Sequence, residues 1–169
     1  MKTAPFFLVF FVLLASCSSI KVQTNYDDTV DFAPYKTFAF HDESIEIEGT
    51  SAPRVAVARV IKDELEAELI SDGYQESRDN PDFLVAFHAS VIDPASADYN
   101  PGRYSAWGQG ATMIKIVSEG TLIVDIIDAG SNELVWRGTA TAAVERGSNK
   151  ASEKIHDAVH KIMAKFPPR

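Results

Sequence analysis

Hydrophobic residues recur along this chain with two different spacings, which predict helices in two regions and strands in others. Between Pro53 and Gly73, apolar residues come at every fourth position, the spacing of one helical face. Proline is tolerated in the first turn and glycine commonly follows the last, so both ends of this helix are marked. A second helix is expected over residues 148–166, because its apolar residues also share a face and Pro167 prevents continuation. The predicted apolar faces comprise Val57, Ile61, Leu65 and Leu69 in the first helix and Ile155, Val159, Ile162, Met163 and Phe166 in the second.

The remaining apolar stretches are typical of strands. Residues 35–40 are rich in aromatics, and residues 82–91 alternate with both faces apolar at the start, which favours a central position in a sheet. Residues 113–127 are expected to be extended, with an interruption at Gly120. A hairpin-type turn then leads into a last strand over residues 133–144.

These elements follow one another in the order β-α-β-β-β-α. We therefore expect a single α+β domain, in which a mostly antiparallel sheet of about four strands carries two helices on one face. The polar residues 18–24 are expected to form a tether, and the acidic residues 41–52 a loop. Residues 93–112 would form a longer loop, and loops of that length are usually functional or disordered.

The first residues carry the pattern of a secretory signal. Lys2 supplies a positive charge, and residues 6–15 are an apolar stretch shorter than the roughly 20 residues that a membrane-spanning helix needs. Leu14-Ala15-Ser16-Cys17 resembles the lipobox of bacterial lipoproteins. That resemblance implies cleavage before Cys17, a diacylglycerol on its thiol and acylation of the new amino group. The alternative is an ordinary signal peptide with a chance cysteine, which would leave a lone thiol in an oxidising compartment.

The lipobox divides the chain into three parts and predicts its location. Residues 1–16 would be the signal peptide, residues 17–24 the lipidated cysteine and tether, and residues 25–169 the α+β domain. Ser18 stands where lipoproteins kept in the inner membrane typically carry Asp, so the resemblance implies the outer membrane, with the domain facing the periplasm. Three acyl chains anchor a protein far more strongly than one, at about 0.8 kcal/mol per buried methylene.

Composition narrows the classes of partner. The chain carries 16 basic and 24 acidic residues, and the signal peptide removes one lysine and no acid, so the formal charge changes from −8 to about −9. Such an acidic chain is unsuited to nucleic acid, whose phosphates need a basic surface. It is equally unsuited to peripheral binding of anionic lipid headgroups. Membrane attachment would depend on the lipid of Cys17.

The motifs that suggest catalysis or metal binding are weak. His156 and His160 lie four residues apart on a predicted helix, as zinc ligands do, but Asp157 replaces the glutamate of the HExxH motif and no third ligand is evident. Asp125 within an apolar strand suggests either a buried acid with a raised pKa or a strand face that meets water. His88 is expected to bond a neighbouring polar group. We expect no enzyme activity, no metal and no cofactor.

Two groups of aromatic residues have different expected roles. Trp136, with Leu134, is expected to fill the core, while Arg137 pairs with an acid on the opposite face of the strand. The loop aromatics Tyr99, Tyr104 and Trp107 are candidates for contact with an envelope protein partner, since tyrosine and tryptophan are enriched at binding hot spots. Alternatively, they fold back over the sheet.

Several segments together resemble a known family. YKTFAF, DFLVAFH, GTLIVDIIDAGSNELVWRGTA and KIMAKFPP are similar to bacterial envelope lipoproteins known only as a domain of unknown function, DUF4136. The resemblance covers about residues 22–168, implies an envelope lipoprotein and brings no catalytic residues with it. The expected function is a non-enzymatic binding or structural module of the envelope. The alternative is a small-ligand binder with a pocket between the sheet and residues 93–112.

Overall fold

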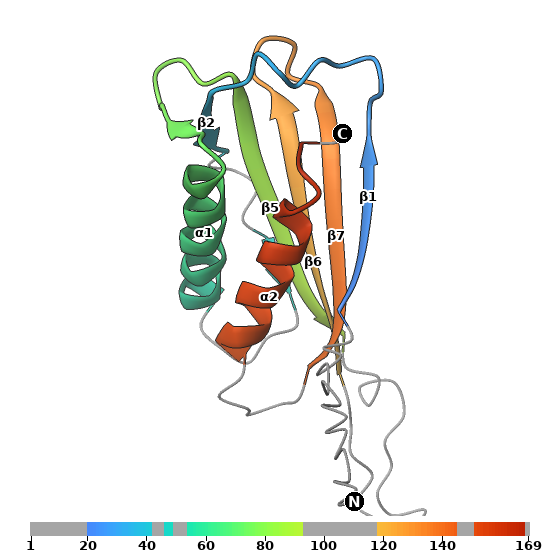
Figure 1. Cartoon of the computed structure of the whole chain (residues 1–169). Helices are drawn as coiled ribbons and strands as arrows, with labels where there is room; N and C mark the ends of the chain where they lie inside the picture. Colours follow the sequence, from blue (N-terminus) through green and yellow to red (C-terminus); the bar gives the residue numbers. More distant parts are fainter. Residues whose placement is uncertain (1–19, 42–45, 49–53, 93–117, 145–150, 168–169) are drawn as a thin grey trace, which may run out of the picture.

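The described part of the chain folds into one mixed β-sheet with two helices packed on the same face (Figure 1). The computed structural model describes residues 20–41, 46–48, 54–92, 118–144 and 151–167. Both helices run beside each other in the same direction, and the α+β class and the one-sided placement of the helices agree with the sequence prediction. In chain order the elements are β1 (Lys21–Tyr26), β2 (Thr37–Phe40), β3 (Glu46–Glu48), α1 (Arg54–Ser71), β4 (Gln75–Glu76), β5 (Phe83–Ile92), β6 (Ser118–Asp128), β7 (Leu134–Val144) and α2 (Ala151–Met163).

The sheet has more strands than predicted, and their directions are mixed. Within the described residues the order is β1-β7-β6-β5-β2-β4. β3 also pairs with β5, further along that strand than β2 does. The four long neighbours β1, β7, β6 and β5 are antiparallel, whereas β2, β3 and β4 join through parallel pairs. The expectation of about four mostly antiparallel strands is therefore correct for one side of the sheet and wrong for the other.

Three strands lie where no strand was predicted. Residues 21–24, assigned to the tether, belong to β1, which forms the edge of the sheet beside β7. β3 lies inside the expected loop 41–52, and β4 is only two residues long. These segments are polar or short, so their side chains carry no alternating pattern, and backbone hydrogen bonds to a neighbouring strand hold them in place. β6 also runs through Gly120, where an interruption was expected.

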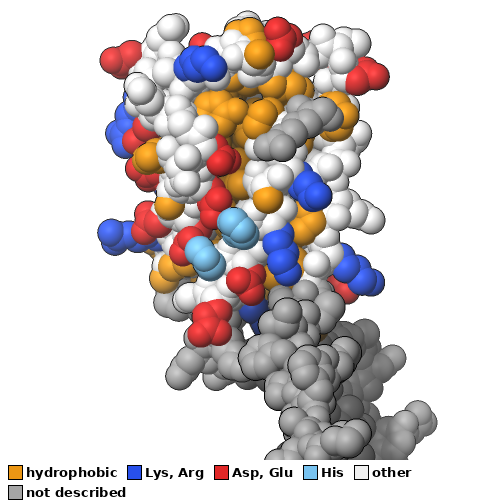
Figure 2. Space-filling model, viewed as in Figure 1, with side chains coloured by type: hydrophobic (Ala, Val, Ile, Leu, Met, Phe, Trp, Pro, Cys, Tyr) orange, Lys and Arg blue, Asp and Glu red, His pale blue; other side chains and the backbone are white. Residues whose placement is uncertain are grey.

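The main core lies between the two helices and the face of the sheet that they cover. The apolar faces predicted from the four-residue spacing are the faces that pack inward, although Val57 and Ile155 at the helix starts are only partly buried. Figure 2 shows apolar side chains between the helices in their upper part, and acidic side chains and histidines between them further down. The most deeply buried helix residues are Ile61, Leu65 and Leu69 of α1 and Val159, Ile162 and Met163 of α2.

A β-bulge changes which residue accompanies Trp136 into the core. Trp136 is fully buried as predicted, but Leu134 is 47% exposed and Val135 is buried instead. Ile126 pairs with Trp136, whereas the next residue of β6 pairs with Leu134, so β7 contains one extra residue at this point. An extra residue interrupts the alternation of faces, and the prediction that Leu134 fills the core is wrong for this reason.

The end of the sheet where β5 begins and β6 ends is densely packed (upper end in Figure 1). Phe166, just beyond α2, makes ring contacts with four other aromatic residues, which lie 5.3–5.9 Å away between ring centroids. Tyr35 is also buried here, and its hydroxyl donates a hydrogen bond to Asp128. These rings close this end of the core. The four partners of Phe166 are Phe32, Tyr74, Phe83 and Trp136.

Candidate functional site

The opposite end of the core is lined by small side chains. The strands β5, β6 and β7 place residues side by side in rows across the sheet. On the face that the helices cover, the side chains in these rows become smaller with distance from the closed end. Near the closed end, Val85, Ile126 and Trp136 form one such row. On the same face, the second row beyond it is Ala89-Leu122-Ala140. The row after that, furthest from the closed end, is Val91-Gly120-Ala142. Because these last rows contain only one large side chain, the helices and the sheet leave space between them.

This space is an apolar cavity of about 170 Å³. It lies where both helices begin and where β5 and β7 end (lower end of the elements in Figure 1). An apolar cavity of such a size favours an apolar occupant, since an engineered cavity of about 150 Å³ in another protein stays dry and binds benzene. The sheet contributes Ala89, Ser90, Val91, Gly120, Thr121, Leu122, Ala140, Ala142 and Val144, and the helices contribute Val57, Ile61, Ala151, Lys154, Ile155 and Ala158.

One cation interrupts the apolar lining. Among the described residues that line the cavity, Lys154 of α2 is the only charged one. Ser90 and Thr121 alternate with the inward-facing residues, so their side chains lie on the other face of the sheet. The Lys154 ammonium donates a hydrogen bond to the backbone carbonyl oxygen of Ala143, which anchors it near the end of β7. Its aliphatic stem can lie along apolar surface while the ammonium remains free to meet a polar group. The cavity therefore combines an apolar body with one positive charge.

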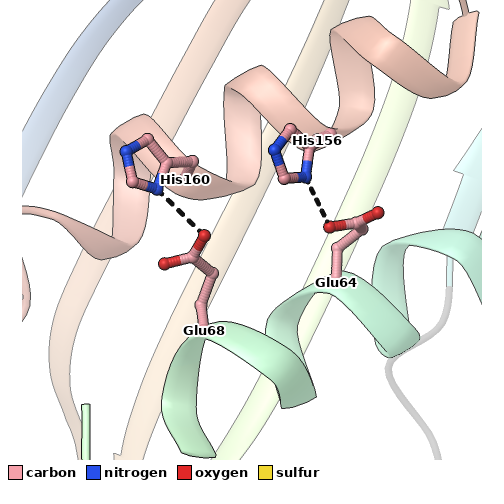
Figure 3. A network of polar contacts seen from close by, with 4 residues as sticks. All are labelled: Glu64, Glu68, His156 and His160. Carbon is pink, nitrogen blue, oxygen red and sulfur yellow. Dashed lines mark hydrogen bonds and ion pairs between the residues drawn. The ribbon is translucent and has the colours of Figure 1, made fainter. Parts of the chain in front are cut away.

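Two parallel histidine–glutamate pairs connect the helices beside the cavity (Figure 3). His156 Nδ1 lies 2.7 Å from Glu64 Oε2, and His160 Nδ1 lies 2.9 Å from Glu68 Oε1. The two pairs are four residues apart on each helix, which is about one helical turn. The hydrogen bond and charge of Glu64 raise the pKa of His156 above its ordinary value of 6.5. Ile155, the neighbour of His156, lines the cavity, so these pairs hold α1 and α2 together alongside it.

This arrangement shows what the histidines contact. Each of them faces its own glutamate, and the two ring centroids lie 6.5 Å apart. No group of three or more histidine, cysteine or acidic side chains suited to a metal occurs among the described residues. Sequence reasoning placed both histidines on the flank of the helix but missed Glu64 and Glu68. The available signal was the matching four-residue spacing of these acids on the polar flank of α1.

The acid within the apolar strand has a direct partner. Asp125 lies on the sheet face that the helices do not cover, where Arg137 donates hydrogen bonds to both of its carboxylate oxygens at 2.6 and 2.7 Å. This pairing confirms the prediction that Arg137 bonds an acid on the opposite face of the strand from Trp136. Of the two expectations for Asp125, it agrees with the one that placed this residue on a strand face that meets water. The hydrogen bond from Arg137 to Asp125 also raises the pKa of the guanidinium.

The other candidate residues divide into two groups. His88 lies in the half-buried part of β5, in register with Ile123 of β6 and Glu46 of β3. Cys17 and the loop aromatics lie outside the described residues, so lipidation and partner contact stay predictions. The predicted small-ligand pocket was placed between the sheet and residues 93–112, whereas the observed cavity lies between the sheet and the helices. The loop aromatics concerned are Tyr99, Tyr104 and Trp107.

The described residues define the class of protein as an α+β domain with two helices on one face of a mixed sheet. Solved structures share this fold. A PDZ domain protein from Parabacteroides distasonis ATCC 8503 is 20% identical, with a TM-score of 0.61 over 89% of this chain and 36% of that protein's chain. The PelC dodecamer from Paraburkholderia phytofirmans is 12% identical, with a TM-score of 0.53 over 89% of this chain and 99% of the PelC chain. At these identities the similarity shows the fold alone.

The family follows from the sequence match. The family model described as "Domain of unknown function (DUF4136)" matches residues 22–168, and the chain belongs to this family. This confirms the resemblance found in the sequence. No curated protein matches the chain. In the described part of the chain, neither helix is both long and apolar enough to cross a membrane.

Proposed function

We propose that this protein is a non-enzymatic binding module of the cell envelope, anchored to the outer membrane through Cys17 and facing the periplasm, and that it binds a small apolar ligand. The observation that carries this proposal is the apolar cavity between the helices and the sheet. Most ligand sites are concave, largely apolar and equipped with a few polar groups that orient the ligand, and this cavity has that composition.

The start of β1 supports a site next to the membrane. Lys21 pairs with Thr141 of β7, and the neighbours of Thr141 on either side, Ala140 and Ala142, line the cavity. Lys21 is the fourth residue after Cys17, and an extended chain of four residues spans at most about 14 Å. A lipid on Cys17 would therefore keep the cavity end of the domain close to the bilayer surface, where apolar molecules are available.

The chemistry of the lining supports binding in preference to catalysis. Nucleophilic catalysis needs a side chain such as serine within hydrogen-bond reach of a general base. Among the described lining residues, Lys154 is the only one with a polar side chain on the cavity side of the sheet, and the lining includes neither a carboxylate nor an imidazole. His156, which follows the lining residue Ile155 in the sequence, points toward Glu64. The proposed module therefore holds its ligand unchanged.

A small apolar probe tests this function directly. We expect toluene, titrated into methyl-labelled protein, to shift the NMR signals of Ile61, Leu122 and Ile155, which lie around the cavity on three elements. The substitution Ala142→Leu should fill the space and abolish these shifts. Ala143→Leu is the matched control, because it makes the same change one residue further along β7, at an exposed position.

Two results would contradict the proposal. One is toluene binding that Ala142→Leu leaves unchanged, and the other is the absence of any saturable shift in the wild-type protein. Denaturant melts of both variants establish that they remain folded before binding is compared.

A further inference from the structure

The only charge in the described lining of the cavity restricts the class of ligand. A neutral hydrocarbon would not need a lysine at its site. Lys154 is half-buried, and its ammonium group can bind a polar group of a ligand at the edge of the apolar lining. An ammonium group has three donors, and the backbone carbonyl oxygen of Ala143 accepts one hydrogen bond from Lys154. An anionic group on the ligand would complete these interactions with a charge-assisted hydrogen bond.

The charge of the rest of the chain makes this lysine selective. The chain has a formal charge of −8, so its surface as a whole repels anions, and a cation in an apolar recess is the exception. An amphiphile with one acid group and an apolar chain would match both parts of the cavity. A zwitterionic or polyanionic headgroup would bring charges that the described lining does not pair.

The volume limits the length of the apolar chain. A cavity of about 170 Å³ is slightly larger than the one of about 150 Å³ that binds benzene, a molecule of six carbons. Roughly six to eight carbons of a saturated chain can therefore be enclosed. We propose that the cavity binds a medium-chain carboxylate, with its hydrocarbon chain between Leu122, Ile61 and Ile155 and its acid group at Lys154. This inference rests on the proposed binding of an apolar ligand and names its chemical class.

Calorimetric titration with octanoate and with 1-octanol separates the role of the charge from that of the chain. We expect octanoate to bind the wild-type protein more tightly than octanol, and Lys154→Met to weaken octanoate binding at least about tenfold, because a hydrogen bond to a charged group is lost. Octanol binding should change by less than about twofold, since methionine retains an apolar stem. Lys165→Met, an exposed lysine beyond α2, is the matched control and should change neither. Lys154→Arg keeps the charge and should retain octanoate binding.

A series of chain lengths tests the size of the enclosed chain. Each methylene buried from water should increase affinity about fourfold, so affinity should rise from butanoate to octanoate. Beyond about eight carbons the added methylenes would extend outside the cavity, and the affinity should level off. A continued rise up to hexadecanoate would show that the chain is not confined by the cavity and would overturn the inference.

The outcomes also separate this inference from the proposed function. If toluene and octanol bind in the cavity but Lys154→Met leaves octanoate binding unchanged, the apolar site stands and the carboxylate assignment is wrong. If octanoate does not bind but vesicles of an anionic phospholipid displace toluene from the cavity, the ligand is a membrane lipid. The inference is again wrong in that case. If none of the probes binds, both the inference and the proposed function fail.

Discussion

His156 on α2 lies with its Nδ1 atom 2.7 Å from Oε2 of Glu64 on α1, and the two residues that join these helices are 92 positions apart in the sequence. The contact is solvent-exposed, and a second pair of the same kind, His160 with Glu68, follows one turn later. The apolar faces beneath these pairs pack the same two helices onto the sheet. The helices are therefore held by an apolar core and by a titratable contact on its surface, and the titratable contact depends on pH.

The stability of the fold should depend on pH through His156. The hydrogen bond with Glu64 is the main reason that the pKa of His156 in the folded protein is raised above 6.5. His156 therefore binds its proton more tightly in the folded than in the unfolded protein. This stabilisation is fully present below pH 6.5 and is lost as the pH rises through the higher folded pKa. We expect urea melts to give His156→Gln a lower free energy of unfolding than the wild type at pH 5.5. The difference should shrink as the pH rises above 6.5 and through the higher folded pKa of His156.

A neighbouring acid provides the control for that experiment. Glu66→Gln removes a carboxylate from the same helix without removing the partner of His156, and its pH dependence should follow that of the wild type. Glu64→Gln should reproduce the behaviour of His156→Gln. If wild type and His156→Gln had parallel pH profiles between 5.5 and 8, the pair would have no energetic role.

Tyr35 should stabilise the closed end of the core through Asp128. The buried Tyr35 hydroxyl donates to Asp128 Oδ2 at 2.6 Å, and this hydrogen bond is the main reason that the pKa of Asp128 is lowered from 3.8. The stabilisation is therefore present above pH 3.8 and is lost as the pH falls through the lower folded pKa. Tyr35→Phe should cost about 1 kcal/mol at pH 7, and the difference from wild type should shrink in acid.

A second tyrosine shows whether the loss belongs to this hydrogen bond. Tyr26 on β1 is 45% exposed, so Tyr26→Phe should change the free energy of unfolding by less than about 0.5 kcal/mol. Equal costs for the two substitutions at pH 7 would contradict the assignment to Asp128. Guanidinium melts at pH 7 and pH 3 measure both.

Gly138 should be required for the close contact between β7 and α2. A Cβ atom at this position would collide with the ring of Trp136 and with Ile162, both fully buried. Gly138→Ala should therefore cost about 1–3 kcal/mol of unfolding free energy, the usual cost of overfilling a packed core. Gly130→Ala, at an exposed turn where the added Cβ would meet only Asp128, should cost less than about 0.5 kcal/mol. A tolerated Gly138→Ala would mean that Trp136 can be repacked.

Cys17 should be the site of membrane attachment. As the only cysteine it is the only residue that the lipobox can modify, so Cys17→Ser should abolish acylation and release the processed chain into the soluble fraction. Labelling with radioactive palmitate and fractionation of cells measure the two effects. Palmitate on the Cys17→Ser protein would show that the lipobox interpretation is wrong.

The helices and the long strands were predictable because their own residues carry the signal. The four-residue spacing of Ile61, Leu65 and Leu69 identified both a helix and its buried face, since a helix brings such positions to one side whatever it packs against. The alternation in β5 likewise indicated a central strand, and β5 does lie between β6 and the pair β2 and β3. The family membership of residues 22–168 was also recognisable from segments of the sequence.

The tertiary structure alone decided which elements meet. β1, β3 and β4 are strands because neighbouring backbones offer them hydrogen bonds, and no pattern in their own side chains requires it. The bulge that exposes Leu134 depends on the register between β6 and β7. The cavity arises because that register aligns Gly120 with Ala142 and, on the other side, with Val91, while two helices cover the same rows. Residues this distant in the chain come together through packing and strand pairing. The sequence therefore determined the helices, the long strands and the buried faces of the helices, whereas the folded structure determined the short strands, the bulge and the site.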